Sequence, residues 1–91
     1  MGVHDLIVKE LFETKSLAAL IFLVDQGREL EFKVNGKECF ISRHGAKQYV
    51  SLWVDKNEQS FGSVPELVEN AKIENMCFFT AWEQAELEYV Y

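Results

Sequence analysis

The first third of the chain places hydrophobic and charged residues at helical spacing. Within residues 4–13 the hydrophobic side chains recur three or four positions apart, with charged ones between them, which predicts an amphipathic helix. Residues 17–26 predict a second helix, because they follow a suitable N-cap, Ser16, and end at Gly27. One helix over residues 4–26 would be about 34 Å long. That length exceeds the expected diameter of so small a domain, so we expect two helices or a bent one.

The following segment has a period of two, which is typical of a strand with one buried face. Residues 29–34 alternate strictly between charged and apolar side chains. Asn35-Gly36 then predicts a two-residue type I′ turn, because both of its central positions need positive φ. Such a turn sets the register with the returning strand, residues 37–43, and it pairs Val34 with Lys37, Lys33 with Glu38, Phe32 with Cys39 and Leu30 with Ile41.

The remaining pattern predicts two more strands, two helices and a final strand. The expected elements are a turn over 44–47, a strand over 48–54, a polar turn over 55–58, a short strand over 59–62, a helix from the capping box at Ser63 and Glu66 to about residue 71, a connection over 72–75, a helix over 76–85 and a strand over 86–91. Together these elements predict an α+β fold. We expect an antiparallel β-meander of about four to five strands packed against N-terminal and C-terminal helices.

Length and composition agree with one domain over residues 1–91. The chain has 91 residues, of which 48% are hydrophobic, and nothing in it resembles a linker. Its two cysteines are too few for a disulfide framework. Its longest apolar run, residues 17–24, is far shorter than the roughly 20 residues of a membrane span, and no signal peptide is evident. We therefore expect a reduced, cytoplasmic protein that does not contact a membrane.

The negative charge lies in the C-terminal part of the chain. Residues 1–56 hold eight acidic and eight basic residues, whereas residues 57–91 hold seven glutamates and Lys72. The net charge of −6 argues against direct nucleic-acid binding, which needs clustered lysine and arginine. The acidic segment either serves solubility or forms a face that attracts a basic partner. Candidate residues for that face are Glu83, Glu86 and Glu88.

Residues that carry catalytic or metal chemistry form no recognisable constellation. Cys39 falls on the core face of the predicted hairpin and Cys77 sits beside Met76, Phe78 and Phe79, so we expect both to be small core side chains. His4 and His44 lack partners at ligand spacing, so we expect ordinary surface histidines. The isolated glycines make no phosphate-binding loop. We therefore expect no catalytic residue, no metal and no cofactor.

Paired carboxylates leave one alternative to this expectation open. Glu29 and Glu31 share one strand face, as do Glu86 and Glu88, and neighbouring strands would bring the four together. Such a cluster could bind a hard cation or raise one carboxyl pKa. The simpler interpretation is that these residues form the solvent-exposed side of amphipathic strands.

Two apolar features suggest contacts beyond the core. Phe40, Tyr49 and Trp53 lie on the face of the meander opposite its apolar side. They are either covered by a helix or form a contact surface for a protein. The run over residues 17–24 is hydrophobic around its whole circumference, so its outer side needs the first helix, the helix over 76–85 or another subunit. The last of these possibilities predicts a homodimer.

Several segments together give a resemblance to known proteins. The segments are GRELEFKVNGKECFIS, SVPELVENAKIEN, a tryptophan and the terminal ELEYVY. Over roughly residues 17–91 the chain resembles small uncharacterised proteins of Gram-positive bacteria and their phages. This resemblance implies a fold and carries no activity and no catalytic residue with it.

Three functions remain open from the sequence. The leading hypothesis is a non-catalytic protein–protein interaction module that contacts an unknown partner or itself through Phe40, Tyr49 and Trp53. The second is an acidic inhibitor that mimics nucleic acid and binds a basic protein through the glutamates of residues 57–91. The third is a metal-dependent enzyme that uses the strand carboxylates.

Overall fold

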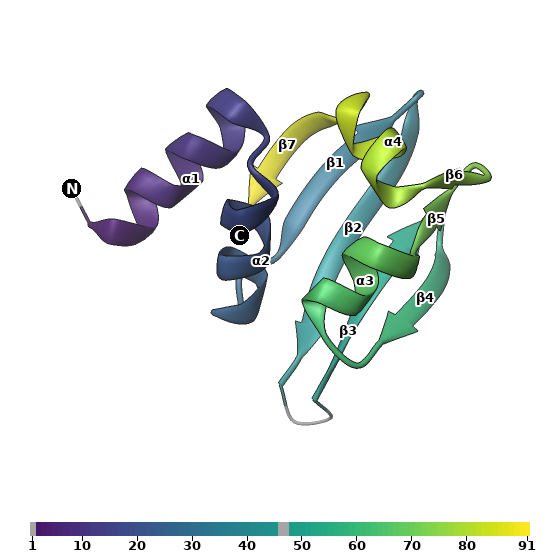
Figure 1. Cartoon of the computed structure of the whole chain (residues 1–91), viewed down its shortest axis with the longest axis horizontal. Helices are drawn as coiled ribbons and strands as arrows, with labels where there is room; N and C mark the ends of the chain where they lie inside the picture. The colour runs from purple at the N-terminus through teal and green to yellow at the C-terminus, as the bar shows by residue number, and fades with distance from the viewer. Residues whose placement is uncertain (1, 46–47) are drawn as a thin grey trace.

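The computed structural model of this protein describes residues 2–45 and 48–91 (Figure 1). The elements follow one another as α1 (Val3–Thr14), α2 (Leu17–Asp25), β1 (Leu30–Val34), β2 (Lys37–His44), β3 (Tyr49–Val54), β4 (Asn57–Phe61), α3 (Val64–Asn70), β5 (Lys72–Ile73), β6 (Met76–Cys77), α4 (Phe78–Glu83) and β7 (Glu86–Val90). The turn expected over residues 44–47 includes Ala46 and Lys47, which lie outside the described residues.

Five strands form one antiparallel sheet in the spatial order β4-β3-β2-β1-β7. The first four make a meander, and β7 returns from the C-terminal segment to pair with the free side of β1. Helices α2, α3 and α4 lie against one face of this sheet, and α1 packs on α2 (Figure 1). The predicted α+β fold, an antiparallel meander with N-terminal and C-terminal helices, is confirmed.

The hairpin of β1 and β2 has the register that the Asn-Gly turn predicts. Leu30 pairs with Ile41, and Phe32 pairs with Cys39. Asn35 and Gly36 have φ angles of 50° and 82°, as a type I′ turn requires. The alternating apolar side chains of both strands consequently point to the helices and are buried.

The N-terminal segment forms two helices, because the backbone turns sharply between them. Lys15 adopts a left-handed conformation with φ of 52°, which ends α1. Ser16 begins α2, and its Oγ accepts a hydrogen bond of 3.1 Å from the backbone N–H of Ala19. The apolar run is thus folded into α2, which packs between α1 and the sheet and buries four residues, namely Ala19, Leu20, Leu23 and Val24.

An aromatic group at the centre of the core holds the C-terminal helix against the sheet. The ring of Trp82 meets Phe32 edge-on at 5.3 Å and stacks on Phe78 at 5.7 Å. The Trp82 indole N–H donates a 2.8 Å hydrogen bond to the backbone oxygen of Lys15. Each such buried aromatic contributes about 1.5–3 kcal/mol by removing apolar surface from water, so this group ties α4 to both the sheet and the junction of the N-terminal helices.

The segment over residues 72–77 forms a second small hairpin where a connection and a helix start were expected. Lys72 pairs with Cys77 and Ile73 with Met76, around a turn in which Glu74 and Asn75 both have positive φ. The predicted helix over 76–85 therefore starts two residues later, at Phe78, and ends at Glu83.

The start of β4 also differs from the expectation. Asp55 and Lys56 have φ angles of 47° and 72° and make a tight two-residue turn. Strand β4 consequently begins at Asn57, two residues before the expected position.

The prediction that both cysteines belong to the core is wrong for Cys77. Cys39 is buried on the helical side of β2, as expected. Cys77 is exposed, because it lies at the N-cap position of α4 and leaves the core position to its neighbour Phe78. The apolar residues around Cys77 in the sequence thus did not indicate its own burial.

The helices have between six and twelve residues. Among the described residues, none of them is long and apolar enough to cross a membrane.

Candidate interaction face

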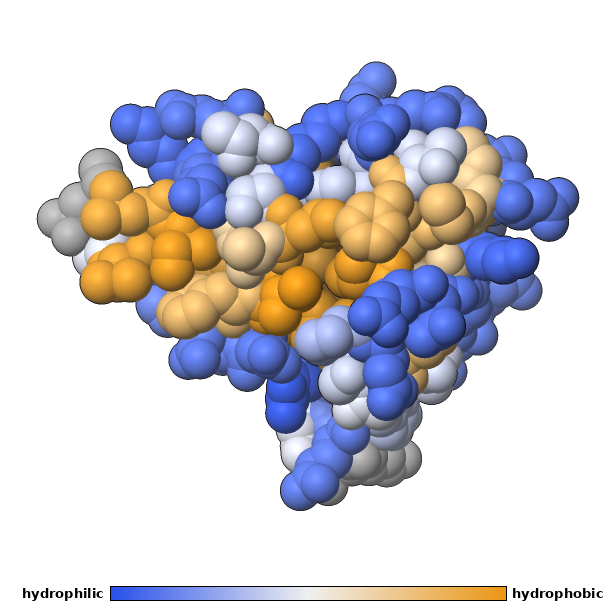
Figure 2. Space-filling model, in the orientation of Figure 1, coloured by the Kyte–Doolittle hydropathy of each residue, from blue (hydrophilic) through white to orange (hydrophobic). Residues whose placement is uncertain are grey.

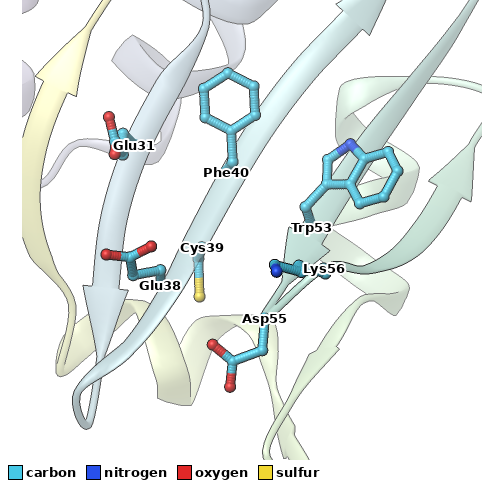
Figure 3. A pocket seen from close by; sticks show the side chains of 7 residues that line it. All are labelled: Glu31, Glu38, Cys39, Phe40, Trp53, Asp55 and Lys56. Atoms are coloured by element: carbon cyan, nitrogen blue, oxygen red, sulfur yellow. The ribbon is translucent and has the colours of Figure 1, made fainter.

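Within the part of the chain that the structure describes, one face of the sheet is not covered by a helix. Strand alternation turns the apolar side chains toward α2, α3 and α4, and it turns their neighbours to the opposite side, here called the open face. The three predicted contact residues, Phe40, Tyr49 and Trp53, all lie on the open face and are half-buried. Figure 3 views this face with the helices behind the sheet. Among the described residues, no helix covers these three side chains, so the fold contradicts the interpretation that a helix buries them.

A single row of side chains crosses all five strands on the open face. Its members are directly paired from strand to strand in the order Tyr89, Glu31, Phe40, Trp53 and Glu58. Cross-strand partners have Cβ atoms about 5 Å apart. The row therefore places two aromatic rings at the centre of the sheet with a glutamate on either side of them.

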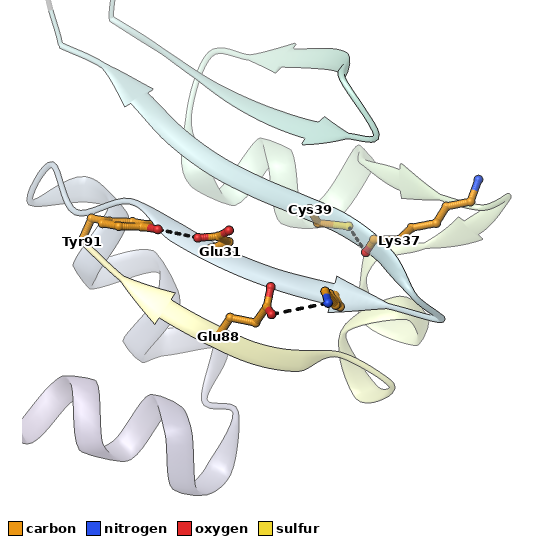
Figure 4. A network of polar contacts seen from close by, with 6 residues as sticks. Glu31, Lys37, Cys39, Glu88 and Tyr91 are labelled. Atoms are coloured by element: carbon orange, nitrogen blue, oxygen red, sulfur yellow. Dashed lines mark hydrogen bonds and ion pairs between the residues drawn. The ribbon is translucent and has the colours of Figure 1, made fainter.

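Tyr91 extends this row toward the end of the chain. Its hydroxyl donates a 2.5 Å hydrogen bond to Oε2 of Glu31 (Figure 4). Its ring meets Phe40 edge-on at 6.2 Å and stacks on Tyr89 at 5.8 Å. The hydrogen bond to the carboxylate raises the pKa of Tyr91 above the ordinary value for tyrosine. Tyr91 thereby fixes the position of the Glu31 carboxylate beside the aromatic rings.

Tyr49 lies apart from the other two predicted contact residues. It pairs with His44 at the far end of β2 and β3, and the two rings lie 4.5 Å apart. Two buried serines, Ser42 and Ser51, separate this pair from Phe40 and Trp53. The structure thus brings Phe40 and Trp53 together and places Tyr49 in a second aromatic group.

A hollow of about 700 Å³ opens on this face beside the aromatic pair (Figure 3). It is lined by Phe40 and Trp53, by the carboxylates of Glu31, Glu38 and Asp55, by Lys56 and by Cys39. Three acidic residues and Lys56 therefore line the hollow, and the Asp55 carboxylate also pairs with Lys37 at 3.9 Å. An exposed concave surface with this combination favours a cationic ligand over an anionic one.

Cys39 lies at the edge of the hollow, but its thiol is buried on the helical side of β2. Burial is the largest cause that raises its pKa to about 11, and the nearby Asp55 carboxylate adds to the effect. Its Sγ contacts the backbone oxygen of Lys37 at 3.7 Å (Figure 4). The nucleophilic thiolate of Cys39 is therefore scarce at neutral pH.

The four strand carboxylates that the sequence paired do not gather at one point. Strands β1 and β7 are neighbours, as that hypothesis requires, but Glu31 accepts the Tyr91 hydrogen bond and Glu88 lies 3.7 Å from the ammonium group of Lys33. Register places Glu86 opposite the same lysine. Within residues 2–45 and 48–91, no three histidine, cysteine or acidic side chains lie close enough to hold a metal ion.

The two histidines lie in separate aromatic contacts. The His4 ring meets Phe22 edge-on at 5.6 Å, and the Arg28 guanidinium approaches its Nδ1 at 3.4 Å. His44 packs on Tyr49 on the open face. Both are half-buried, so each is part of the packing at its own position.

The predicted acidic residues divide between the two sides of the molecule. Glu86 and Glu88 lie on β7 beside Lys33 of the open face. Glu83 lies on α4 and lines a second hollow, on the helical side, together with Lys15 and Phe79. The acidic C-terminal segment therefore does not form one continuous face.

Two aromatic residues of the open face, Tyr89 and Tyr91, were not among the predicted contacts. The alternating pattern of residues 86–91 indicates a strand but does not say which strand it pairs with. A bulge between Glu31 and Phe32 shifts the register, so that Leu87 and Val90 both point to the core side and Tyr89 points to the open face. The aromatic residues at the end of the chain were the sequence signal that could have indicated this contribution to the open face.

The fold and the site together define a small α+β protein whose antiparallel sheet presents an open, aromatic and acidic face. Comparison with protein-family models, with curated proteins and with solved structures finds no match for this chain. The function of the face is therefore inferred from its own residues.

Proposed function

We propose that this protein is a non-catalytic protein–protein interaction module that binds its partner through the open face. Aromatic residues contribute most of the binding energy in many interfaces, because they bury a large area with little loss of conformational freedom. The observation that carries the proposal is the uncovered Phe40–Trp53 pair at the centre of the sheet.

The surroundings of this pair support a specific contact rather than a loose apolar surface. The tyrosines beside it remain exposed, with 63% of Tyr89 and 56% of Tyr91 accessible to solvent. Their hydroxyls and the neighbouring carboxylates form a polar rim around the apolar rings. An apolar centre with a polar rim is usual in interfaces between proteins that are also stable on their own. The sheet beneath is held by its own hydrogen bonds and by the core, so the face is rigid before it binds.

The test is affinity capture with the protein as bait, using a lysate of the organism that encodes it. The bait variant carries Phe40→Ser and Trp53→Ser, and the control bait carries Phe79→Ser, which alters an aromatic residue that is 50% exposed on the helical side. We expect the wild type and the control to retain the same partner, and the double variant to lose it. Equal capture by all three baits would contradict the proposal, provided that circular dichroism shows each to be folded.

A second copy of the chain is the alternative partner, and an apolar band on the helical side favours it. Figure 2 shows this band running over α1 and across α2 toward α4. Its large exposed side chains include Val3, Leu6 and Phe22. Helix α1 packs Ile7, Val8 and Leu11 against the core and leaves three large apolar side chains exposed, namely Val3, Leu6 and Phe12. We therefore propose self-association through this band as a separate function from partner binding at the open face.

A further inference from the structure

We propose that the partner's contact to the open face is a basic segment, and that an arginine side chain of this segment enters the hollow between Phe40, Trp53 and the carboxylates. This inference rests on the proposed function and names the chemistry of the partner. It follows from the charge of the hollow, from the shape of its walls and from the fixed position of one carboxylate.

The charge of the open face is strongly one-sided. The described strands turn five glutamates and one lysine to this side, namely Glu31, Glu38, Glu58, Glu86, Glu88 and Lys33. The lysine is already engaged by Glu88. Among the described residues, Glu38 makes neither an ion pair nor a side-chain hydrogen bond. A basic segment would supply the missing positive charge and would be steered to this side of the molecule.

The aromatic walls favour a planar cation. Phe40 and Trp53 lie side by side, and Figure 3 shows Glu38 and Asp55 on the same flank of the pair. A guanidinium group stacks on aromatic rings and donates hydrogen bonds to carboxylates in the same plane. A lysine ammonium group is more strongly hydrated and has no plane to stack. Arginine therefore matches both the rings and the carboxylates.

Glu31 is positioned for this role before any ligand arrives. The Tyr91 hydroxyl holds its Oε2, which leaves Oε1 as an acceptor directed by that hydrogen bond. Tyr91 is itself anchored by two hydrogen bonds. Its backbone N–H donates to the backbone oxygen of Glu29 at 2.8 Å, and its backbone oxygen accepts from the Arg28 side chain at 2.6 Å. A carboxylate fixed in this way loses less conformational entropy on binding.

The same negative charges disfavour single-stranded nucleic acid, which aromatic faces also commonly bind. Single-stranded nucleic acids stack their bases on aromatic residues, but they need a positively charged groove for their phosphates. Here the aromatic pair is bordered by Glu31 and Glu58. A basic peptide is attracted where a phosphate backbone would be repelled.

The experiment is a titration of the intact protein into a fluorescein-labelled peptide of alternating glycine and arginine, followed by fluorescence anisotropy. Two matched peptides carry lysine or neutral citrulline in place of arginine. We expect the arginine peptide to bind, the lysine peptide to bind several-fold more weakly and the citrulline peptide not to bind. Equal affinity for arginine and lysine would overturn the assignment of arginine, and equal affinity for citrulline would overturn the requirement for charge.

Matched variants separate a site from a general effect of net charge. Glu38→Gln removes a carboxylate from the hollow, and Glu69→Gln makes the same change in charge on the exposed surface of α3. Loss of one charge-assisted hydrogen bond predicts about tenfold weaker binding for Glu38→Gln, with binding by Glu69→Gln close to the wild type. Equal loss in the two variants would overturn the site.

The outcome is distinguishable from failure of the proposed function. If the Phe40→Ser and Trp53→Ser bait loses its captured partner while the arginine peptide fails to bind, the open face is an interaction surface and the inference about its partner is wrong. If the peptide binds but capture does not depend on the aromatic pair, the arginine site stands and the proposed function falls.

Discussion

At the scale of single residues, environment rather than sequence neighbourhood decides the chemistry of the two cysteines. Burial keeps the Cys39 thiol protonated, with its pKa raised to about 11. Cys77 is exposed at the start of α4, where a hydrogen bond with Thr80 is the largest cause that lowers its pKa. The two thiols therefore differ in both accessibility and the fraction present as thiolate.

This difference predicts selective alkylation in the native protein. At neutral pH, iodoacetamide is expected to label Cys77 rapidly and Cys39 only after denaturation, as read by peptide mass spectrometry. The rate at Cys77 should increase as pH rises toward its lowered pKa, because the thiolate is the reacting form. Cys77→Ser should leave the native protein unlabelled. Native labelling of Cys39 at a similar rate would contradict the burial of β2.

Individual residues also show why the site could be predicted only in part. Phe40 was identified because the Asn-Gly turn assigns each residue of the β1–β2 hairpin to a face. Trp53 was identified because the alternation of the next strand assigns its residues to the two faces. Tyr89 could not be assigned, because its direction depends on a bulge in the pairing of β1 and β7. A bulge changes the side to which every later residue points, and nothing in the local pattern of β7 indicates it.

At the scale of elements, long periodic segments were predictable and short ones were not. The helices over α1 and α2 and the hairpin of β1 and β2 have enough residues for their period to be read. The β5–β6 hairpin has two residues in each strand, which is too few for any period, and its turn uses Glu74 and Asn75 in place of a typical pair. Its strands were therefore assigned to a connection and to the next helix.

The N-terminal helices change the argument for a dimer. The apolar run was expected to need cover on its outer side, and α1 supplies part of it by packing on α2. The apolar surface that remains uncovered lies on α1 itself, where 67% of Val3 and 54% of Leu6 are exposed. An exposed apolar patch of this kind is typical of a contact surface.

Sedimentation velocity at micromolar to hundred-micromolar concentration tests this element directly. We expect a dimer to form with increasing concentration, and Val3→Glu with Leu6→Glu to shift the equilibrium to the monomer, since a dimer would have to bury the new charges. The double variant should keep the stability of the wild type, because both side chains are exposed. A single species of 10.5 kDa at every concentration would contradict self-association.

At the scale of the whole molecule, the two sides of the sheet differ in the residues they carry. The helical side holds the core, including Trp82, and carries the apolar band on its outer surface (Figure 2). The open face holds Trp53 among carboxylates. The net charge of −6 is thus not spread evenly, because the open face concentrates negative groups around an aromatic centre.

The acidic C-terminal segment contributes to this distribution without forming a face of its own. Glu66 accepts a hydrogen bond of 3.1 Å from the backbone N–H of Gly62 at the start of α3, and Glu83 lies at the hollow of the helical side. Only part of the segment, including Glu58 and Glu86, reaches the open face. The arrangement of the sheet therefore favours a basic partner at the open face. An inhibitor that mimics nucleic acid through all the glutamates of residues 57–91 would need these scattered side chains to act together.

The two tryptophans provide the most direct test of the open face, because each reports on one side of the sheet. In a two-dimensional ¹⁵N–¹H NMR spectrum, the indole N–H of Trp82 is hydrogen-bonded to Lys15 inside the core, whereas Trp53 borders the hollow. On titration with the arginine peptide, we predict that the Trp53 indole signal shifts in proportion to binding and that the Trp82 signal stays in place. An unchanged Trp53 signal at saturating peptide, or equal shifts of both signals, would contradict binding at the open face.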